Sequence, residues 1–411
     1  MNPSTVDPSA RSSRRRFLLG AANGALGLIL AACGLGQSSE SSAPTPSAGP
    51  SVPPTPSPTL SPTPIATAGP SLRERIGQML LVGFRGLTAD QAPEIVADIR
   101  DRKLGGVLLF DTDQPTHSAV RNIRDPAQVK ALVGALKALA STPLLVAVDE
   151  EGGLVARLDQ RHGFPATYSA AQLGARNDTT FTRGQGQKIA DTLHAAGINL
   201  NLAPVVDLNV NPNNPIIGSL GRSFSADPAV VTAQAGAFIA GHRAVGVKTT
   251  LKHFPGHGSS TGDTHLGVVD VTNTWSRTEL QPFANLIRQR LPDAVLTAHV
   301  FNAHLDAEYP ATLSGATINL ILREQLGWQG VVISDDMQMG AIRKAYGYED
   351  ALRLAIEAGV DILTIAQQQV YEPGIVARTI DLIAGLVAQR LLTEARIDES
   401  YRRILALKAA L

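Results

Sequence analysis

The stretch Lys252–His265, KHFPGHGSSTGDTH, holds three histidines, a lysine, an aspartate and three glycines within fourteen residues. It follows the β-branched run Val247–Leu251, so we expect Lys252 and His253 at the end of a strand and the remainder in a glycine-rich loop. Side chains of these types hold polar substrates and transfer protons. A surface loop with merely solvated histidines is the alternative, but the density of titratable groups favours an active site.

Other polar residues also follow apolar, strand-like runs. Asp149, Asp207, His299 and Asp335 each end such a run. In a barrel of parallel strands, the carboxyl ends of the strands share one rim, where active sites form. Because unpaired charges gathered on that rim would cost free energy, we expect one active site rather than several decorated loops.

Asp335 is followed directly by a second carboxylate, Asp336. Side chains alternate along a strand, so the two cannot both face the barrel axis. We therefore expect one site carboxylate and one loop or helix-start residue. The alternative is that both cap the following helix.

From Ser71 onward, short apolar runs alternate with longer helical patterns, as in sheets built from βα units. We expect strands at Met79–Phe84, Gly106–Phe110, Leu144–Asp149, Ile198–Asp207, Val247–His253, Ala294–His299, Val331–Asp335 and Asp361–Ile365. Expected helices include Pro126–Ala140, Phe181–Ala196, Pro228–Ala244, Arg277–Gln289, Gly315–Leu326 and Glu349–Ala358. The pattern predicts an α/β fold, a (β/α)8 TIM-type barrel forming a single catalytic domain over residues 71–411. A doubly wound open sheet is the alternative, but no GxGxxG follows the first strand.

The first 33 residues have the pattern of an export signal. Arg14, Arg15 and Arg16 precede an apolar run that ends at Ala32 and is too short to span a bilayer comfortably. SRRRFLL resembles a twin-arginine signal, and LAACG resembles a bacterial lipobox with Cys33 as the lipid attachment site. We expect an exported lipoprotein, anchored by its N-terminal lipid to the membrane on the extracytoplasmic side of a bacterial cell envelope. A retained transmembrane or amphipathic anchor is the alternative.

Composition adds three expectations. Residues 34–70 are rich in Ser, Pro and Thr, which predicts a disordered, extended linker. Cys33 is the only cysteine, so the mature protein would have no internal disulfide. With 36 basic and 36 acidic residues, the chain has no net field to attract nucleic acid, and we expect no nucleic-acid partner.

KHFPGHG followed by DTH, together with VDEEGG before it and SDDMQM after it, resembles glycoside hydrolase family 3. The resemblance is to the single-domain β-N-acetylglucosaminidase (β-hexosaminidase) branch and runs from about Leu72 to Leu411. It implies that Asp335 is the nucleophile, that His265 is the general acid/base, and that Asp263 orients His265.

This implied chemistry is physically consistent. A carboxylate can attack the anomeric carbon because the transition state is oxocarbenium-like, and hydrolysis of the resulting glycosyl-enzyme gives net retention. A histidine can protonate the leaving oxygen and later take a proton from water, provided a neighbouring carboxylate fixes its tautomer. We expect the glycines of the loop to let it move between open and closed states during turnover.

The resemblance also implies substrate-binding residues: Asp149, Arg157, Arg222 in GRSF, Lys252 and His253. One position departs from the family pattern VDxEGGRVxR, because this chain has Leu154 in place of the first arginine and keeps only Arg157. The departure affects the contacts of this loop and not the chemistry.

The expected activity is that of a retaining exo-β-N-acetylglucosaminidase acting on terminal β-GlcNAc of cell-wall fragments or chito-oligosaccharides, without a cofactor. Two related alternatives are a β-glucosidase and a β-N-acetylglucosaminide phosphorylase. The phosphorylase is considered because a histidine acid/base, unlike a carboxylate, does not repel phosphate. A surface-tethered glycan-binding protein without activity is an alternative of a different class. A metal-dependent hydrolase is disfavoured, because the first strand segment Leu81–Phe84 offers no HxH ligand pair.

Overall fold

The computed structural model describes residues 69–411. The expected signal sequence, Cys33 and nearly all of the expected linker lie outside the described residues.

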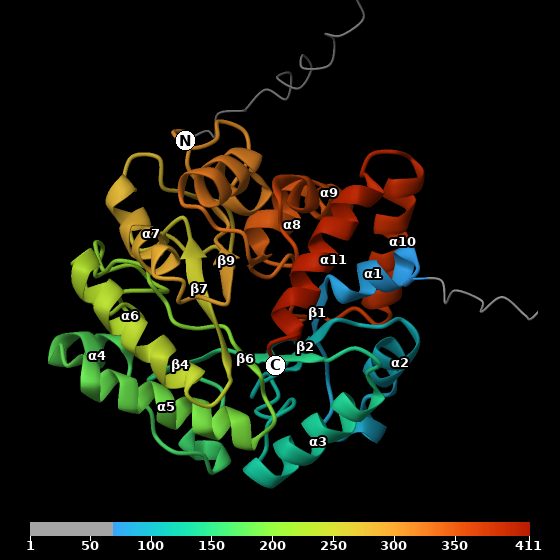
Figure 1. The fold of residues 1–411 in the computed structure, drawn as a ribbon, viewed down its shortest axis with the longest axis horizontal. Helices are drawn as coiled ribbons and strands as arrows, with labels where there is room; N and C mark the ends of the chain where they lie inside the picture. The colour runs from blue at the N-terminus through green and yellow to red at the C-terminus, as the bar shows by residue number, and fades with distance from the viewer. Residues whose placement is uncertain (1–68) are drawn as a thin grey trace, which may run out of the picture. The chain divides into compact units, whose positions relative to one another are not determined.

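Eight parallel strands form the centre of the fold, in the spatial order β11-β9-β7-β6-β3-β2-β1-β12 (Figure 1). The strands are β1 (Leu80–Gly83), β2 (Gly106–Leu108), β3 (Leu145–Val148), β6 (Leu200–Asn201), β7 (Lys248–Phe254), β9 (Ala294–Thr297), β11 (Val331–Ile333) and β12 (Leu363–Ile365). The first strand pairs with the last at Leu80 and Leu363, and an isolated parallel bridge from Ile333 to Ile362 closes the ring. The predicted (β/α)8 barrel is therefore confirmed.

Helices surround the strands (Figure 1). The α-helices are α1 (Leu72–Gln78), α2 (Pro93–Asp101), α3 (Pro126–Leu139), α4 (Ala170–Arg176), α5 (Thr179–Ala195), α6 (Pro228–Arg243), α7 (Gln281–Arg288), α8 (Gly340–Tyr346), α9 (Tyr348–Ala358), α10 (Ile375–Ala388) and α11 (Glu394–Lys408). Their starts are encoded locally. Asp125 and Asp227 cap α3 and α6 by accepting backbone N–H groups, and a proline follows each cap where no N–H is needed.

The strands are buried on both faces, as expected where helices cover a parallel sheet. Val107, Val146, Leu251, Val295 and Val332 are fully buried within one continuous apolar core. These buried apolar side chains form most of the core that holds the strands and the surrounding helices together.

Three expected elements differ in detail. The strand expected over Ile198–Asp207 is only β6, because Pro204 has no N–H for the ladder, and Asp207 lies in the loop beyond it. The helix expected over Arg277–Gln289 begins as a 3₁₀ turn, Arg277–Leu280 (η4), before α7. The helix expected over Gly315–Leu326 is a π-helix, Ala316–Gln325 (η6).

Small additions shape the rim. A hairpin of β4 (Glu150–Gly152) and β5 (Val155–Ala156) follows β3, and β8 (Val269–Asp270) pairs with β10 (Val300–Phe301). Further 3₁₀ turns are Ala89–Gln91, Gln114–Thr116, Gln160–His162 and Ala311–Leu313. Across residues 69–411, no helix has both the length and the apolar character needed to cross a bilayer.

Candidate active site

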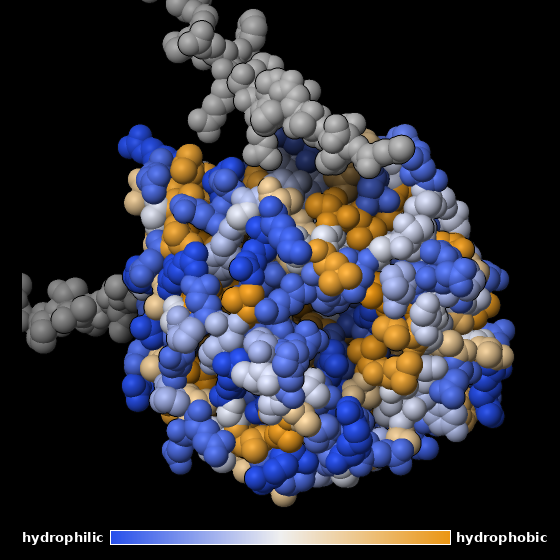
Figure 2. All heavy atoms as spheres, turned by 180° about the vertical axis from the view of Figure 1, so that it is seen from behind, coloured by the Kyte–Doolittle hydropathy of each residue, from blue (hydrophilic) through white to orange (hydrophobic). Residues whose placement is uncertain are grey.

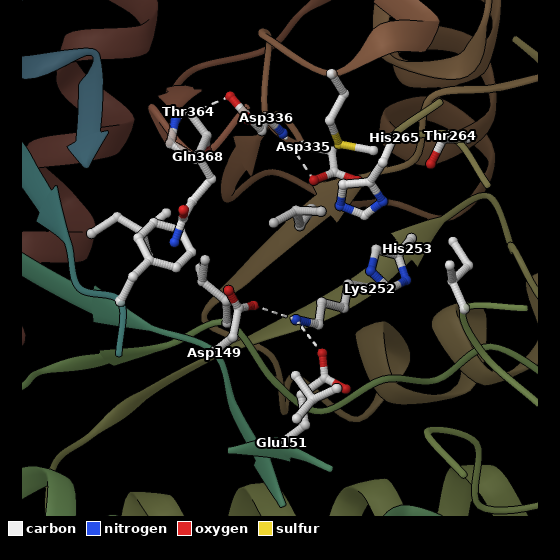
Figure 3. A pocket seen from close by; sticks show the side chains of 18 of the residues that line it. Asp149, Glu151, Lys252, His253, Thr264, His265, Asp335, Asp336, Thr364 and Gln368 are labelled. Atoms are coloured by element: carbon white, nitrogen blue, oxygen red, sulfur yellow. Dashed lines mark hydrogen bonds and ion pairs between the residues drawn. The ribbon is translucent and has the colours of Figure 1, made fainter. Parts of the chain in front are cut away.

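A pocket of about 380 Å³ opens at the carboxyl-terminal end of the barrel. It brings together most of the side chains singled out from the sequence (Figure 3). Its lining includes Asp149, Arg157, Arg222, Lys252, His253, His265 and Asp335. Asp263 does not line the pocket and instead contacts His265 from behind.

Two acidic and two basic side chains form one wall. The Lys252 Nζ lies 2.6 Å from Asp149 Oδ1 and 2.6 Å from Glu151 Oε1. Arg222 donates two hydrogen bonds to the Glu151 carboxylate, each 2.7 Å long. Burial alone would raise the pKa of Glu151, but Arg222 and Lys252 outweigh it and hold this pKa well below its usual range. The wall is thus a fixed array of charged donors and acceptors suited to sugar hydroxyls.

Glu151 is a residue that sequence reasoning missed. It stands beside Glu150 in VDEEGG, and the two carboxylates diverge because side chains alternate along β4. Glu150 points into the protein and accepts the Leu158 N–H at 2.8 Å, while Glu151 lines the pocket. The alternation of side chains along a strand indicates that only one of these two glutamates can face the site.

Replacing Glu151 by Gln is expected to destabilise the protein by about 3 kcal/mol and to raise KM about tenfold, because Lys252 and Arg222 lose a buried counter-charge. Denaturant unfolding and steady-state kinetics measure the two effects. An unchanged free energy of unfolding would contradict the proposed role of the wall.

Glu150→Gln is the matched control. Burial raises the pKa of Glu150 from 4.5 to about 8, so the group folds largely protonated at neutral pH, and an amide replaces it at little cost. A raised pKa in the folded state means that its contribution to stability is lost as pH rises from about 4.5 towards 8. Glu150→Gln should therefore become more stable relative to the wild type across this window.

His253 is oriented from behind by Asp207. Its Nδ1 lies 2.7 Å from Asp207 Oδ2, and its Nε2 lies 3.3 Å from the Nη2 of Arg222. Since the guanidinium can only donate, Nε2 faces it as the acceptor and Nδ1 faces the buried carboxylate as the donor. Asp207 also accepts the backbone N–H of His257 at 2.8 Å, so one carboxylate joins the sugar-facing histidine to the loop that follows it.

Asp335 and Asp336 both line the pocket, but their carboxylates have different surroundings. Asp336 accepts the backbone N–H groups of Gln338 and Ala366, and burial raises its pKa to about 6. Asp335 follows β11 and lines the pocket. Burial alone would raise the pKa of Asp335, but His299, His253 and His265 outweigh it and lower this pKa. Asp335 is thus the carboxylate that stays ionised and faces a ligand.

The Asp263 carboxylate accepts both the Nδ1–H of His265, at 2.7 Å, and its backbone N–H, at 2.8 Å. This fixes the tautomer and leaves Nε2 directed away from Asp263. Figure 3 shows His265 beside Asp335, on the side of the pocket away from Asp149 and Glu151. The geometry is that of a proton donor held next to a carboxylate.

The loop carrying His265 is docked on the start of α8. The backbone N–H of Gly340 donates to the His265 carbonyl and that of Ala341 to the Thr264 carbonyl, each at 3.1 Å. The first N–H groups of a helix have no partner within it, so these loop carbonyls satisfy them. Gln369 adds a third bond, from its side-chain amide to the His265 carbonyl at 3.0 Å. In this structure the loop is therefore held against α8.

Gly340→Ala is expected to lower kcat by about 10- to 100-fold with a smaller change in KM, because a small misplacement of a catalytic group is costly. A Cβ at this position would lie 2.6 Å from the His265 carbonyl oxygen and 2.8 Å from that of Leu266, which would push the loop off α8. Gly134→Ala in α3 is the control, since a Cβ there meets nothing within 4 Å. Equal kcat values for the two variants would contradict the docking role.

Two further histidines, His257 and His299, support the site from buried positions. His257 is buried, its Nδ1 lies 2.7 Å from Ser260 Oγ, and burial lowers its pKa to about 4. His299 is buried with Nδ1 at 2.8 Å from Thr312 Oγ1 and Nε2 at 2.9 Å from the Asp336 carbonyl. Both are buried, hydrogen-bonded groups that hold the loop and the end of β11, and burial also lowers the pKa of His299.

One guanidinium nitrogen of Arg157 lacks a hydrogen-bond partner among the described residues. Its guanidinium packs over the Phe110 ring and lies 3.7 Å from the Asp111 carboxylate. Within residues 69–411 its buried Nε has no hydrogen-bond partner. Because this nitrogen is buried within the protein, a ligand in the pocket cannot reach it, and the terminal nitrogen of Arg157 is the one that lies near Asp111.

The chain matches the model of the glycosyl hydrolase family 3 N-terminal domain over residues 71–407. It is 36% identical over 334 residues to a beta-hexosaminidase of Xylella fastidiosa strain M23, covering 80% of this chain and 92% of that one. It is 31% identical to beta-hexosaminidase A of Pseudoalteromonas piscicida, covering 82% of this chain but only 61% of the relative.

Solved structures give the same result. A glycoside hydrolase family 3 beta-N-acetylglucosaminidase from Paenibacillus sp. str. FPU-7 has a TM-score of 0.75 at 35% identity, covering 83% of this chain and 62% of that one. Beta-N-acetylhexosaminidase from Beutenbergia cavernae DSM 12333 has a TM-score of 0.73 at 34% identity, covering 82% and 98%. The chain therefore belongs to glycosyl hydrolase family 3, as its motifs predicted, and is a glycoside hydrolase.

Proposed function

We propose that the protein is a retaining exo-β-N-acetylglucosaminidase that releases terminal β-GlcNAc from chito-oligosaccharides or cell-wall fragments. The observation that carries the proposal is the pairing, in one pocket, of an ionised Asp335 with His265, whose Nδ1 is held 2.7 Å from Asp263. The names of the similar proteins support the sugar class.

In the first step, the Asp335 carboxylate attacks the anomeric carbon while protonated His265 donates its Nε2 proton to the glycosidic oxygen. The bond from the anomeric carbon to the leaving oxygen breaks, the alcohol departs, and a glycosyl ester of Asp335 remains. Asp263 stabilises the imidazolium before transfer. Lys252, Asp149, Arg222 and His253 hold the sugar hydroxyls during the displacement.

In the second step, neutral His265 takes a proton from water as the water oxygen attacks the anomeric carbon. The ester bond to Asp335 breaks, and the carboxylate is restored. Two inversions give net retention, and His265 returns to its protonated form ready for the next cycle.

A panel of aryl glycosides tests this function. We expect release of the aryl group from β-GlcNAc, little from β-glucoside, no stimulation by phosphate, and a first product with the β configuration by NMR. Preference for the glucoside would indicate a β-glucosidase, and a sugar 1-phosphate product would indicate a phosphorylase. A first product with the α configuration would contradict retention. If no substrate were turned over, the alternative of a glycan-binding protein without activity would be favoured.

We also propose, from the twin-arginine-like and lipobox-like motifs, that the protein is exported and anchored to the membrane through lipid on Cys33. Labelling of cells with a radioactive fatty acid should mark the wild type but not Cys33→Ser. Equal labelling of the wild type and the variant would show that Cys33 is not the attachment site.

A further inference from the structure

Leu154 is a large apolar side chain placed openly at the pocket. It sits at the turn of the β4–β5 hairpin, lines the pocket, and is 75% exposed. A single exposed leucine on an outer surface is unremarkable, but one that lines a ligand pocket is a candidate contact for the ligand. On the face drawn in Figure 2, hydrophobic residues lie in small groups among hydrophilic ones.

The hairpin holds Leu154 in place. Gly152 and Gly153 adopt positive φ values of 95° and 66°, and the Gly153 N–H donates to Thr167 Oγ1 at 3.1 Å. The backbone packs so closely that a Cβ on Gly152 would lie 2.3 Å from the Tyr168 carbonyl oxygen. Leu154 is therefore presented by a fixed turn, and its exposure is not the result of an unsupported loop.

The charge around the pocket is already balanced. Among the described residues that line it, the lysine and arginine side chains are Lys252, Arg222 and Arg157. Lys252 and Arg222 pair with Glu151, and Arg157 lies 3.7 Å from Asp111. The other side chains that accompany Leu154 in the lining include neutral ones: Gln114, Ile216, Leu220, Met339, Gln368 and Gln369. A carboxylate on the leaving group would thus lose hydration without gaining an unpaired lysine or arginine.

Resting on the proposed function, we propose that Leu154 forms an apolar subsite for the leaving group and selects a neutral sugar there. The occupant is the second unit of a glycan, whose pyranose C–H face packs on the leucine. The preferred substrates are then neutral oligosaccharides of β-linked N-acetylhexosamine, and glycans with a carboxylate on the second unit are disfavoured. Leu154 thereby acts as a specificity-determining residue at the position where the family pattern has arginine.

Two disaccharides with the same terminal β-GlcNAc test the proposal. In one the second unit is N-acetylglucosamine, and in the other it is the 3-O-lactyl ether of that sugar, which carries a carboxylate. Release of GlcNAc gives kcat/KM for each. We expect the wild type to favour the neutral disaccharide by about tenfold or more.

Variants at Leu154 then separate apolar contact from charge. Leu154→Ala should lower kcat/KM for the neutral disaccharide about 3- to 10-fold and change the acidic one little. Leu154→Arg should raise kcat/KM for the acidic disaccharide about tenfold, and salt should reduce this gain. Leu320→Ala is the matched control, because Leu320 lies on η6, is 50% exposed and does not line the pocket.

Equal kcat/KM for the two disaccharides in the wild type would overturn the proposal, and so would equal losses on both in Leu154→Ala. Failure of the proposed function is distinguishable, because then neither disaccharide nor an aryl β-GlcNAc would be cleaved. Since Leu154 is largely exposed, its replacement removes little buried surface, and an unchanged Tm for each variant confirms that the fold is kept.

Discussion

Replacing Asp335 by Asn is expected to lower kcat on an aryl β-GlcNAc by about 10⁴-fold or more, with Tm nearly unchanged. Asn keeps the shape of the side chain and can still accept the Asp336 N–H, which now bonds Asp335 Oδ1 at 2.8 Å. It cannot form the glycosyl ester at a useful rate because its amide oxygen is a poor nucleophile. Steady-state kinetics and thermal unfolding measure the two effects together.

The neighbouring carboxylate provides the control. Asp336→Asn should cost far less activity, because Asp336 bonds backbone N–H groups and its pKa of about 6 already leaves it partly protonated near neutral pH. An activated 5-fluoro β-GlcNAc analogue should leave its sugar esterified to Asp335, as read by peptide mass. A label on any other residue, or full activity in Asp335→Asn, would show that the nucleophile lies elsewhere.

His265→Ala is expected to have the second-largest effect, about 10²- to 10³-fold on kcat/KM for substrates with poor leaving groups and much less for substrates with good ones. Natural glycosides leave as alcohols that need a proton, whereas a dinitrophenolate leaves without one. The measurement is kcat/KM against leaving-group pKa for a series of aryl β-GlcNAc substrates, because kcat/KM reports the step in which the leaving group departs, and the variant should give the steeper line.

Asp263→Asn is the companion variant. It keeps the 2.7 Å contact to His265 Nδ1 in shape but removes the charge that stabilises the imidazolium, so an intermediate loss with the same leaving-group trend is expected. Parallel lines for the wild type and His265→Ala would mean that the proton comes from another group.

Much of the fold could be predicted from the sequence because its signals are local. Most strands of the barrel are short apolar runs, and Asp149, Lys252 and Asp335 lie at or near the carboxyl ends of strands, so their meeting on one rim follows from the topology. The same reasoning overextended β6, where Pro204 interrupts the ladder. Local pattern thus indicates which residues meet, but not where each strand stops.

The support of the site could not be predicted, because it depends on contacts between distant segments. Asp207 fixes His253 across 46 positions, and the His265 loop rests on the N–H groups at Gly340 and Ala341. Glu151 needed the hairpin geometry to separate it from Glu150. Such hydrogen bonds between distant residues do not produce a periodic pattern in the sequence.

Ring closure has a consequence for how the protein is made. The closing contacts join early and late residues: β1 pairs with β12, and the Lys408 Nζ donates to the Gly105 carbonyl, 303 positions away. A ribosome must therefore synthesise the residues from β1 to Lys408 before the barrel core can seal, so the barrel cannot close while its last elements are still being made. Until then apolar strand edges stay open, and the interval between synthesis and closure is when chaperones would be needed most.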